Sequence, residues 1–299
     1  MVPPLLSYIT FNRLGLTAQN LPAILQSTDD FEMHIIDNNS HDGTWEYLQS
    51  VQDVRIKSKT RMPLNSGKIY ALNTNLTLRK PDQYFITVDN DVYIKTKDWI
   101  SRFLKIFDTF PEVGVLGVQT KQGYSKSLPL ITPKFNNGVR YLELNKKSVD
   151  LYGAFLPGYC QCLRPELIEM FGYWNEENYY GDIELTARIS NFTSFKLGFV
   201  PDIAISMPQS IECRNCPNEK QCHLDKYHTT CFSIYKKLYK HHDFCKKFNW
   251  KFKESFKDMK AGTRSVFCAS ALDENSMKNH PFNMKWALEN FRFYIDNAN

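Results

Sequence analysis

Two aspartates separated by one residue, Asp89 and Asp91, form the stretch of this sequence best suited to metal chemistry. They follow residues 84–88, an aromatic and β-branched run that predicts a buried strand. In open α/β sheets ligands bind beyond the carboxyl ends of the strands. Two carboxylates there can bind Mg²⁺ or Mn²⁺, and such an ion would neutralise a pyrophosphate leaving group. A plain polar turn is the alternative, because Asp and Asn are ordinary turn residues.

The residues before this pair alternate between strand and helix patterns. Residues 5–10 and 32–37 are typical of strands, and residues 17–27 between them carry apolar side chains at helical spacing. This strand-helix-strand order implies parallel strands. A further helix, strand and helix are predicted over residues 44–49, 54–57 and 65–78. We therefore expect an α/β fold in which Asp89 and Asp91 lie at the carboxyl edge of a sheet.

Length and composition indicate a globular protein. With 299 residues, 42% of them apolar, the chain can bury a large core, and its length allows one large domain or two. It contains no run of 18 apolar residues, and residues 1–6 lack the basic end and long apolar region of a signal peptide. A cytoplasmic protein without a membrane span is expected.

Four short motifs follow one another in the first third of the chain. They are Thr10-Phe11-Asn12-Arg13, Ile35-Ile36-Asp37-Asn38-Asn39-Ser40-His41-Asp42-Gly43-Thr44, Asn65-Ser66-Gly67 and Val88-Asp89-Asn90-Asp91. In order and spacing the sequence resembles the family-2 glycosyltransferases of GT-A fold, over about residues 4–206. The resemblance implies a Rossmann-like open mixed sheet with flanking helices, and an enzyme that transfers a sugar from a nucleotide-sugar donor.

The first two motifs would hold the nucleotide. By resemblance, Thr10, Asn12 and Arg13 line the nucleotide pocket, where an arginine suits a diphosphate. Asp37 would accept a hydrogen bond from the base, which favours uracil with its ring N–H. A helix-capping turn is the alternative for Asp37 and Asn38.

The next two motifs would hold the diphosphate and the metal. A helix that begins near Asn65, Gly67 and Lys68 offers its N-terminus to an anion, although a solvated charge is the simpler interpretation of Lys68. Asp89 would contact the ribose or a metal-bound water, and Asp91 would ligate Mn²⁺ or Mg²⁺ directly. The predicted donor-binding residues are Thr10, Asn12, Arg13, Asp37, Asn65, Gly67, Lys68, Asp89 and Asn90.

The second half should supply acceptor and catalyst. A helix over residues 99–110 and a buried strand over 113–118 belong to the core, and the polar segment 121–137 reads as a flexible loop near the site. Further strands are predicted over 149–156, 159–163, 195–199 and 202–206, with a helix that starts at Arg164-Pro165.

Residues 180–188 carry a second specific motif. In the resembling family an aspartate at the start of a helix is the general base, and Asp182 fits that position. It would take the proton of an acceptor hydroxyl that attacks the anomeric carbon in a single, inverting displacement. A helix N-cap is the alternative for Asp182. Glu184 would orient the acceptor or pair with Arg188, Trp174 would form a sugar-stacking wall, and Gly158 would let backbone approach the sugar.

The third metal ligand of the family is missing from its usual place. Many relatives have a histidine just past the last strand, where this sequence has Ser206-Met207-Pro208-Gln209. His223, His228 or water would have to complete the metal shell.

Four cysteines lie close together beyond that point: Cys213, Cys216, Cys222 and Cys231. Without an export signal they indicate a structural metal rather than disulfides, and Zn²⁺ suits a closed four-thiolate site. His223 or His228 could replace one ligand. An iron–sulfur cluster and unliganded loop thiols are the alternatives.

A basic amphipathic helix is predicted over residues 234–257, within a region (236–260) that holds nine lysines against three acidic residues. It would lie on an anionic bilayer beside a lipid-linked acceptor, or pack its apolar stripe on a core. Nucleic acid is not an expected partner, since no recognition motif accompanies the charge.

Together these patterns predict an inverting, metal-dependent glycosyltransferase. The donor would be a UDP-sugar, and the acceptor a hydroxyl of a glycan, a lipid-linked sugar or a peptide. We expect a GT-A domain over residues 1–206, with a donor half (1–95) and an acceptor half (96–206), and a cysteine-rich, largely helical extension over 207–299. The alternatives are a nucleotidyltransferase acting on sugar phosphates and a non-catalytic scaffold that binds sugar nucleotides.

Overall fold

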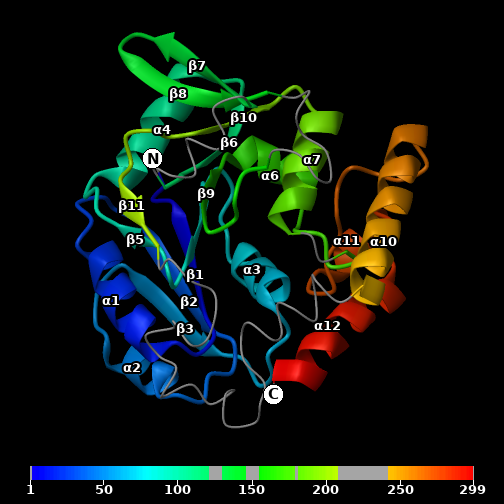
Figure 1. Ribbon diagram of the computed structural model, residues 1–299, viewed down its shortest axis with the longest axis horizontal. Coiled ribbons are helices and arrows are strands. Elements are labelled where there is room, and N and C mark those ends of the chain that lie inside the picture. Colours follow the sequence, from blue (N-terminus) through cyan, green and yellow to red (C-terminus); the bar gives the residue numbers. More distant parts are fainter. Residues whose placement is uncertain (1, 121–129, 146–154, 179–180, 208–241, 299) are drawn as a thin grey trace.

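A large mixed sheet with helices on both faces forms the body of the protein (Figure 1). The computed structural model describes residues 2–120, 130–145, 155–178, 181–207 and 242–298. Within these ranges the main sheet has nine strands in the order β3-β2-β1-β4-β9-β6-β10-β8-β7. They are β1 (Leu5–Thr10), β2 (Glu32–Asp37), β3 (Ile56–Arg61), β4 (Phe85–Asp89), β6 (Val113–Gly117), β7 (Ile131–Asn136), β8 (Val139–Leu144), β9 (Cys160–Leu163) and β10 (Lys196–Phe199). A small second sheet pairs β5 (Tyr93–Ile94) with β11 (Ile205–Ser206).

The order of the strands reverses beside β1. Strands β3, β2, β1 and β4 run parallel, with β2 on one side of β1 and β4 on the other. β9 then lies antiparallel between β4 and β6. At such a switch point the carboxyl ends of the two central strands border a crevice. The residues that follow β1 and β4, Arg13 and Asp91 among them, are therefore placed where a ligand can enter.

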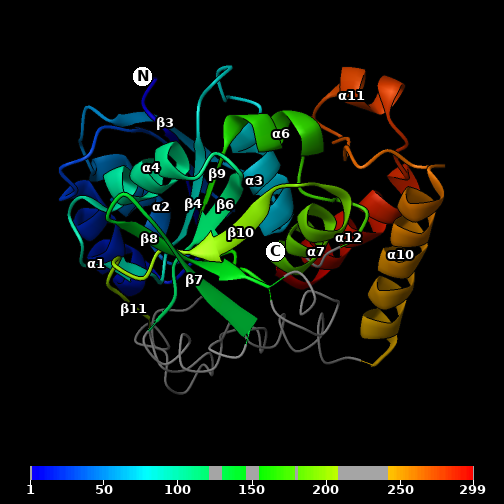
Figure 2. The ribbon, with the colours of Figure 1, turned by 90° about the horizontal axis from the view of Figure 1, so that it is seen from above.

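Two apolar clusters, one on each face, hold the helices to the sheet. In the described part of the chain the helices are α1 (Leu14–Leu25), α2 (Thr44–Ser50), α3 (Lys68–Leu76), α4 (Trp99–Thr109), α6 (Pro165–Phe171), α7 (Asp182–Phe192), α10 (His242–Ala261), α11 (Glu274–Asn279) and α12 (Met284–Ala298). Because side chains alternate along a strand, Leu6 and Ile86 face α1 and α4, while Leu5 and Phe85 face α3, α6 and α7. Figure 2 shows these helices on opposite sides of the sheet.

The C-terminal helices share the second of these clusters. Phe252 and Phe256 of α10 are buried in it, and Phe256 meets Phe192 of α7 with ring centroids 5.4 Å apart. On α12, Phe291 packs edge-on against Tyr70 of α3 at 5.0 Å. The described part of residues 207–299 is thus packed on the sheet domain, and the predicted boundary at residue 206 stays a prediction.

Two members of the amphipathic stripe predicted over residues 234–257 lie in the described part of α10, and both pack inward. These members, Phe252 and Phe256, belong to the core, so these two rings are not available to a bilayer, and for them the core alternative is correct. None of the helices in the described ranges is long and apolar enough to cross a membrane. The four-cysteine cluster, Cys213 to Cys231, lies outside the described residues.

The prediction of a loop over residues 121–137 is wrong in its second half, because residues 131–136 form β7. Asn137 and Gly138, with φ of 47° and 73°, connect β7 to β8 as a two-residue hairpin. Both positions need left-handed backbone, which is why Asn-Gly is a strong hairpin signal. Other boundaries differ as well. The strand predicted over 54–57 is β3 (Ile56–Arg61), and the helix predicted over 65–78 is α3 (Lys68–Leu76). The helix predicted over 17–27 is α1 (Leu14–Leu25), and the strand predicted over 202–206 is β11 (Ile205–Ser206). Most of the strand predicted over 149–156 lies outside the described residues.

Candidate active site

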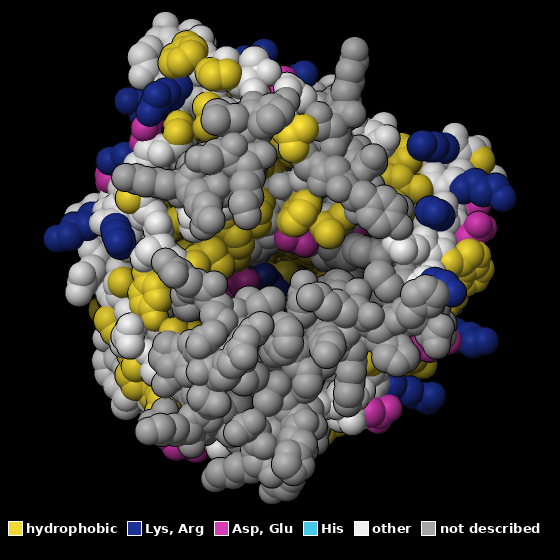
Figure 3. Space-filling model, in the orientation of Figure 1, with side chains coloured by type: hydrophobic (Ala, Val, Ile, Leu, Met, Phe, Trp, Pro, Cys, Tyr) yellow, Lys and Arg dark blue, Asp and Glu magenta, His cyan; other side chains and the backbone are white. Residues whose placement is uncertain are grey.

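Two adjoining cavities lie at the switch point. We call them the Asp91 pocket, of about 220 Å³, and the Asp182 pocket, of about 230 Å³, after one aspartate that lines each. Lys68, Asp89 and Tyr294 line both. Figure 3 shows a hollow near the middle of this face, with acidic and basic side chains at its base. Asp91 and Asp182, which are 91 residues apart in sequence, therefore belong to one composite cleft.

Each aspartate at the end of β4 faces a cation. Asp91 Oδ2 lies 3.0 Å from Arg13 Nη1, and Asp89 Oδ1 lies 2.6 Å from Lys68 Nζ. Burial raises the pKa of Asp89, although the Lys68 ammonium opposes this rise. Asn90 between them also lines the Asp91 pocket, and its side-chain amide donates to Thr17 Oγ1 at 3.1 Å.

Lys68 is positioned by the turn that opens α3. Asn65 Oδ1 accepts hydrogen bonds from the Gly67 N–H (2.9 Å) and from Asn38 Nδ2 (2.8 Å), and Gly67 has a φ of 85° that favours glycine. Lys68 Nζ also donates to the Gly158 carbonyl at 3.1 Å. Burial acts to lower the pKa of Lys68, but nearby carboxylates outweigh it and the pKa lies above its usual value. Lys68 is therefore ion-paired with Asp89, although its side chain stays 39% exposed.

Asp182 is held at the first position of α7, and Gly181 occupies the N-cap. Its Oδ2 accepts from the Gly158 N–H at 2.7 Å, and its Oδ1 from the Ile183 N–H at 3.0 Å. Burial raises the pKa of Asp182, opposed by the Gly158 hydrogen bond and by Lys68. A carboxylate with a raised pKa and an orienting donor is a suitable proton acceptor. Gly158 is close-packed here, since a Cβ on it would lie 3.0 Å from Asp182 Cβ.

Asp37, the predicted base-binding residue, lies behind the wall of the Asp91 pocket, where it contacts the pocket residue Thr10. It has no exposed surface, and it accepts hydrogen bonds from Thr10 Oγ1 (3.1 Å) and the Ser40 N–H (3.0 Å). Burial raises the pKa of Asp37, and these donors oppose the rise. In this geometry it does not contact a base directly. Asn12 is equally buried and accepts from the His41 N–H at 2.9 Å, whereas Thr10 does line the Asp91 pocket.

The three predicted acceptor residues have different surroundings. Gly158 and Trp174 line the Asp182 pocket, although Trp174 is only 4% exposed and its ring centroid lies 5.6 Å from that of Phe85. Glu184 is completely buried and lies 3.1 Å from Arg188 Nε, so its assignment to the acceptor is wrong and the ion-pair alternative is correct.

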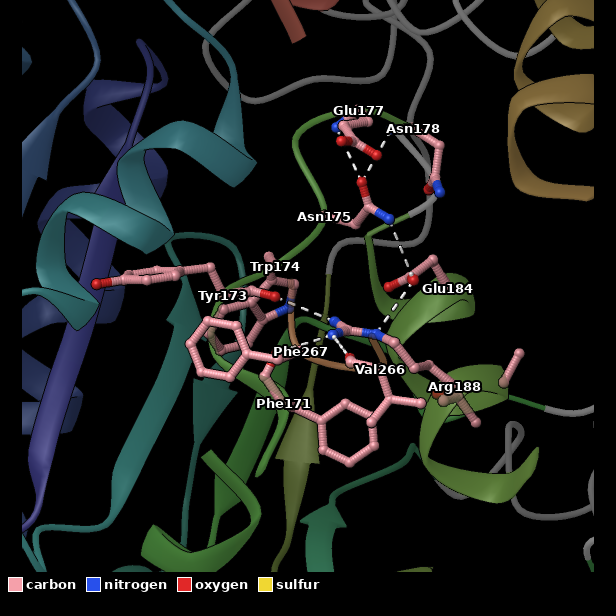
Figure 4. Close-up of polar contacts among 12 residues, drawn as sticks. Phe171, Tyr173, Trp174, Asn175, Glu177, Asn178, Glu184, Arg188, Val266 and Phe267 are labelled. Atoms are coloured by element: carbon pink, nitrogen blue, oxygen red, sulfur yellow. Dashed lines mark hydrogen bonds and ion pairs between the residues drawn. The ribbon is translucent and has the colours of Figure 1, made fainter. Parts of the chain in front are cut away.

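Arg188 is the centre of the network behind Asp182 (Figure 4). Its guanidinium donates to the carbonyls of Phe171 (2.9 Å), Tyr173 (3.0 Å) and Val266 (3.0 Å). The buried Glu184 balances its charge. This network ties α7 to Val266, which precedes α11, and it fixes the helix that carries Asp182.

Sequence reasoning missed several residues of the cleft. Thr87 and Gln161, from β4 and β9, line the Asp182 pocket, and so does Tyr294 of α12. The alternating pattern of β4 would have identified Thr87 as lying two residues before Asp89 on the same face. No local signal points to Tyr294, which lies outside every motif named above.

Asp89 and Asp91 carry carboxylate oxygens, the hard ligands that Mg²⁺ and Mn²⁺ prefer. In the described ranges no group of three or more His, Cys, Asp and Glu side chains is placed to hold a metal ion. Any third protein ligand would come from elsewhere, and His223 and His228 lie outside those ranges. The two carboxylates fit the group, provided that Lys68 or Arg13 yields a coordination position.

Comparisons with known proteins agree with this fold. The chain is similar in fold to TarS 1–349 of S. aureus, with 16% identity and a TM-score of 0.51, over 68% of this chain and 59% of that one. It is also similar to the mannosyltransferase PcManGT from Pyrobaculum calidifontis, solved with GDP-Man and Mn²⁺, at 14% identity and a TM-score of 0.54, over 99% and 87% of the two chains.

GalNAc-T7, solved with UDP, GalNAc and Mn²⁺, gives 12% identity and a TM-score of 0.51 over 87% of this chain and 58% of that one. No curated protein matches the chain. The profile of the family described as Glycosyl transferase family 2 matches residues 8–170, more than half of the sequence. The protein therefore belongs to glycosyl transferase family 2.

Proposed function

We propose that the protein is an inverting glycosyltransferase that moves a sugar from a nucleotide-sugar, with UDP as the expected nucleotide, to a hydroxyl of a glycan, a lipid-linked sugar or a peptide. One observation carries the proposal. The Asp91 pocket and the Asp182 pocket meet at Lys68 and Asp89, so a donor bound across this junction presents its anomeric carbon to a base.

The Asp91 pocket suits the donor's diphosphate. Arg13 and Lys68 offer positive charge, and the start of α3 offers backbone N–H groups to an anion. Asp89 and Asp91 would hold Mn²⁺ or Mg²⁺, which when bound supplies further charge neutralisation to the leaving group. TarS has been solved with UDP and with UDP-GlcNAc, and PcManGT with GDP-Man, which supports a nucleotide-sugar here.

The Asp182 pocket suits the transfer itself. The acceptor oxygen forms the new bond to the anomeric carbon while the bond from that carbon to the phosphate oxygen breaks on the opposite face, which inverts the configuration. Asp182 takes the hydroxyl proton, and the Gly158 N–H keeps its carboxylate oriented. Lys68, facing Asp89 and the Gly158 carbonyl, remains near the departing phosphate charge. Trp174 closes the apolar side of the pocket.

The decisive experiment follows nucleotide release from UDP-, GDP- and dTDP-sugars with Mn²⁺ and a panel of hydroxyl acceptors. We expect Asp182→Asn to lower transfer about 10²–10⁴-fold, the contribution of a positioned base. Asp108→Asn, a change at an exposed position of α4, is the matched control and should leave transfer unchanged. Full transfer by Asp182→Asn would remove the base assignment. Pyrophosphate as the product would identify a nucleotidyltransferase, and binding without turnover would identify a scaffold.

The predicted zinc site remains a separate proposal. Cys213, Cys216, Cys222 and Cys231 would hold one Zn²⁺ in a segment outside the described residues. Metal analysis of the purified protein should give one equivalent of zinc, lost on replacing the first pair by serine. Membrane contact through residues 234–257 is tested by flotation with anionic vesicles at low salt, and absence of retention would exclude it.

A further inference from the structure

Helix α12 brings an aromatic side chain to the junction between the two pockets. Tyr294 is partly buried and lines both the Asp91 pocket and the Asp182 pocket, a property it shares with Lys68 and Asp89. It lies outside residues 8–170, the range that the family profile matches. The junction is therefore built partly from a segment that this profile does not cover.

The inner face of α12 determines where Tyr294 lies. Ala287, Asn290, Phe291 and Tyr294 recur at helical spacing, and the first three are at most 8% exposed. Phe291 packs edge-on against Tyr70 of α3 at 5.0 Å. Tyr294 follows Asn290 by four residues, so an anchor at Asn290 also orients Tyr294.

That anchor leads back to α3. Asn290 Nδ2 donates to the Glu176 carbonyl at 2.5 Å. The Glu176 side chain accepts from Asn73 Nδ2 at 2.7 Å, and the same amide donates to the Trp174 carbonyl at 2.9 Å. Asn73 belongs to α3, whose first residue is Lys68. The two helices that meet at the junction are thus joined through one buried residue, Glu176, whose backbone carbonyl accepts from α12 and whose carboxylate accepts from α3.

A second set of contacts fixes the outer side of α12. Glu289 pairs with the buried Lys251 of α10 at 2.9 Å, and Glu177 accepts from the Asn283 N–H directly before the helix. Arg264 pairs with Glu177 as well. Because both faces of α12 are tied down, Tyr294 forms a preorganised wall, and binding a ligand against it needs little ordering of the helix.

We propose that Tyr294 is a positioning residue for the donor, with its ring packed against the bound molecule where the sugar joins the diphosphate. The inference rests on the proposed function and adds a contact to it. In that function the diphosphate lies beside Lys68 and Asp89, and the sugar lies on the Asp182 side, so the bond that breaks passes this ring. The ring restricts the sugar to the orientation that exposes its anomeric carbon and excludes water from the opposite side.

The test compares Tyr294→Phe, Tyr294→Leu and Tyr294→Ala in the full chain, with Leu288→Ala on an exposed side of the same helix as the matched control. Transfer to an acceptor and hydrolysis of the donor without acceptor are measured for each. We expect about a 10–100-fold loss of kcat/KM for the donor in the Leu and Ala variants, since a misplaced substrate costs up to about 10²-fold. The ratio of hydrolysis to transfer should rise, and Phe should restore both readouts.

The outcomes distinguish a failure of this inference from a failure of the proposed glycosyltransferase function. If the wild-type chain neither binds nor turns over any nucleotide-sugar, the proposed function fails. If it is active and Tyr294→Leu matches Leu288→Ala in both readouts, the inference is overturned. A loss in Tyr294→Phe equal to that in Tyr294→Ala also overturns it, because the ring would then not be the acting group. Melting curves identify an unfolded variant, and the Phe and Leu variants, which keep apolar bulk, decide the case if Ala does not fold.

Discussion

Replacing Arg188 by methionine should destabilise the protein more than replacing any exposed arginine. Arg188 and Glu184 are both completely buried, 3.1 Å apart, and Arg188 also donates to three carbonyls. Removing one partner of a buried pair leaves an uncompensated charge and costs about 3–5 kcal/mol. At about 2.1 cal/mol/K of unfolding entropy per residue, 299 residues give about 0.6 kcal/mol/K, so Tm should fall by about 5–8 °C.

Urea unfolding and thermal melting measure this loss, with Arg102→Met as the control because Arg102 forms an exposed pair with Asp98. Such exposed pairs contribute about 0–1 kcal/mol. The double variant Glu184→Gln/Arg188→Met should be more stable than Arg188→Met alone, because it removes the stranded carboxylate. A single-variant loss below about 1 kcal/mol, or no recovery in the double variant, would refute the account of a charge-balanced network behind Asp182.

Three further predictions concern the cleft. The rate of transfer should decrease at acidic pH, because Asp182 takes up a proton at its raised pKa. Lys68→Met should move this acid limb of the pH profile to higher pH, because the positive charge that lowers the pKa of Asp182 is lost. An unmoved limb would contradict the electrostatic role of Lys68. Asp91→Ala should weaken Mn²⁺-dependent UDP binding, and calorimetry that gives an intact affinity would exclude it as a ligand. Gly158→Ala, whose Cβ would lie 3.0 Å from Asp182 Cβ, should lower kcat by up to about 10²-fold with a melting curve near that of the wild type, and an unchanged kcat would show that the neighbouring side chain relaxes.

Strand order predicted only half of the cleft. Asp91 follows β4, whose carboxyl end lies beside that of the parallel strand β1, whereas Asp182 opens α7, and its place at the same cleft was predicted through the family resemblance. The family resemblance added the roles. Spacing alone did not separate Asp182 from Glu184, because residues two apart on a helix differ by about 200° in direction. Only the packing of α7 decides which carboxylate faces the cleft and which pairs with Arg188.

Other parts of the site depend on contacts that no local pattern encodes. Asp37 was predicted to meet the base, but the hydroxyls of Thr10 and Ser40 surround it. Tyr294 lies in a helix whose periodicity predicts a buried face, yet the identity of the cavity it lines depends on the docking of α12 against α3. The hairpin at Asn137 and Gly138, in contrast, had a readable signal that was overlooked.

The link through Glu176 has a consequence for the order of assembly. Asn73 and Glu176 are 103 residues apart, and Glu176 and Asn290 are 114 apart. Forming contacts between residues so far apart in sequence costs loop-closure entropy before the contacts stabilise the chain, and so they form late in folding. During refolding, backbone circular dichroism should therefore recover before nucleotide binding does, and a chain stalled between these two events would possess its sheet while lacking a competent active centre.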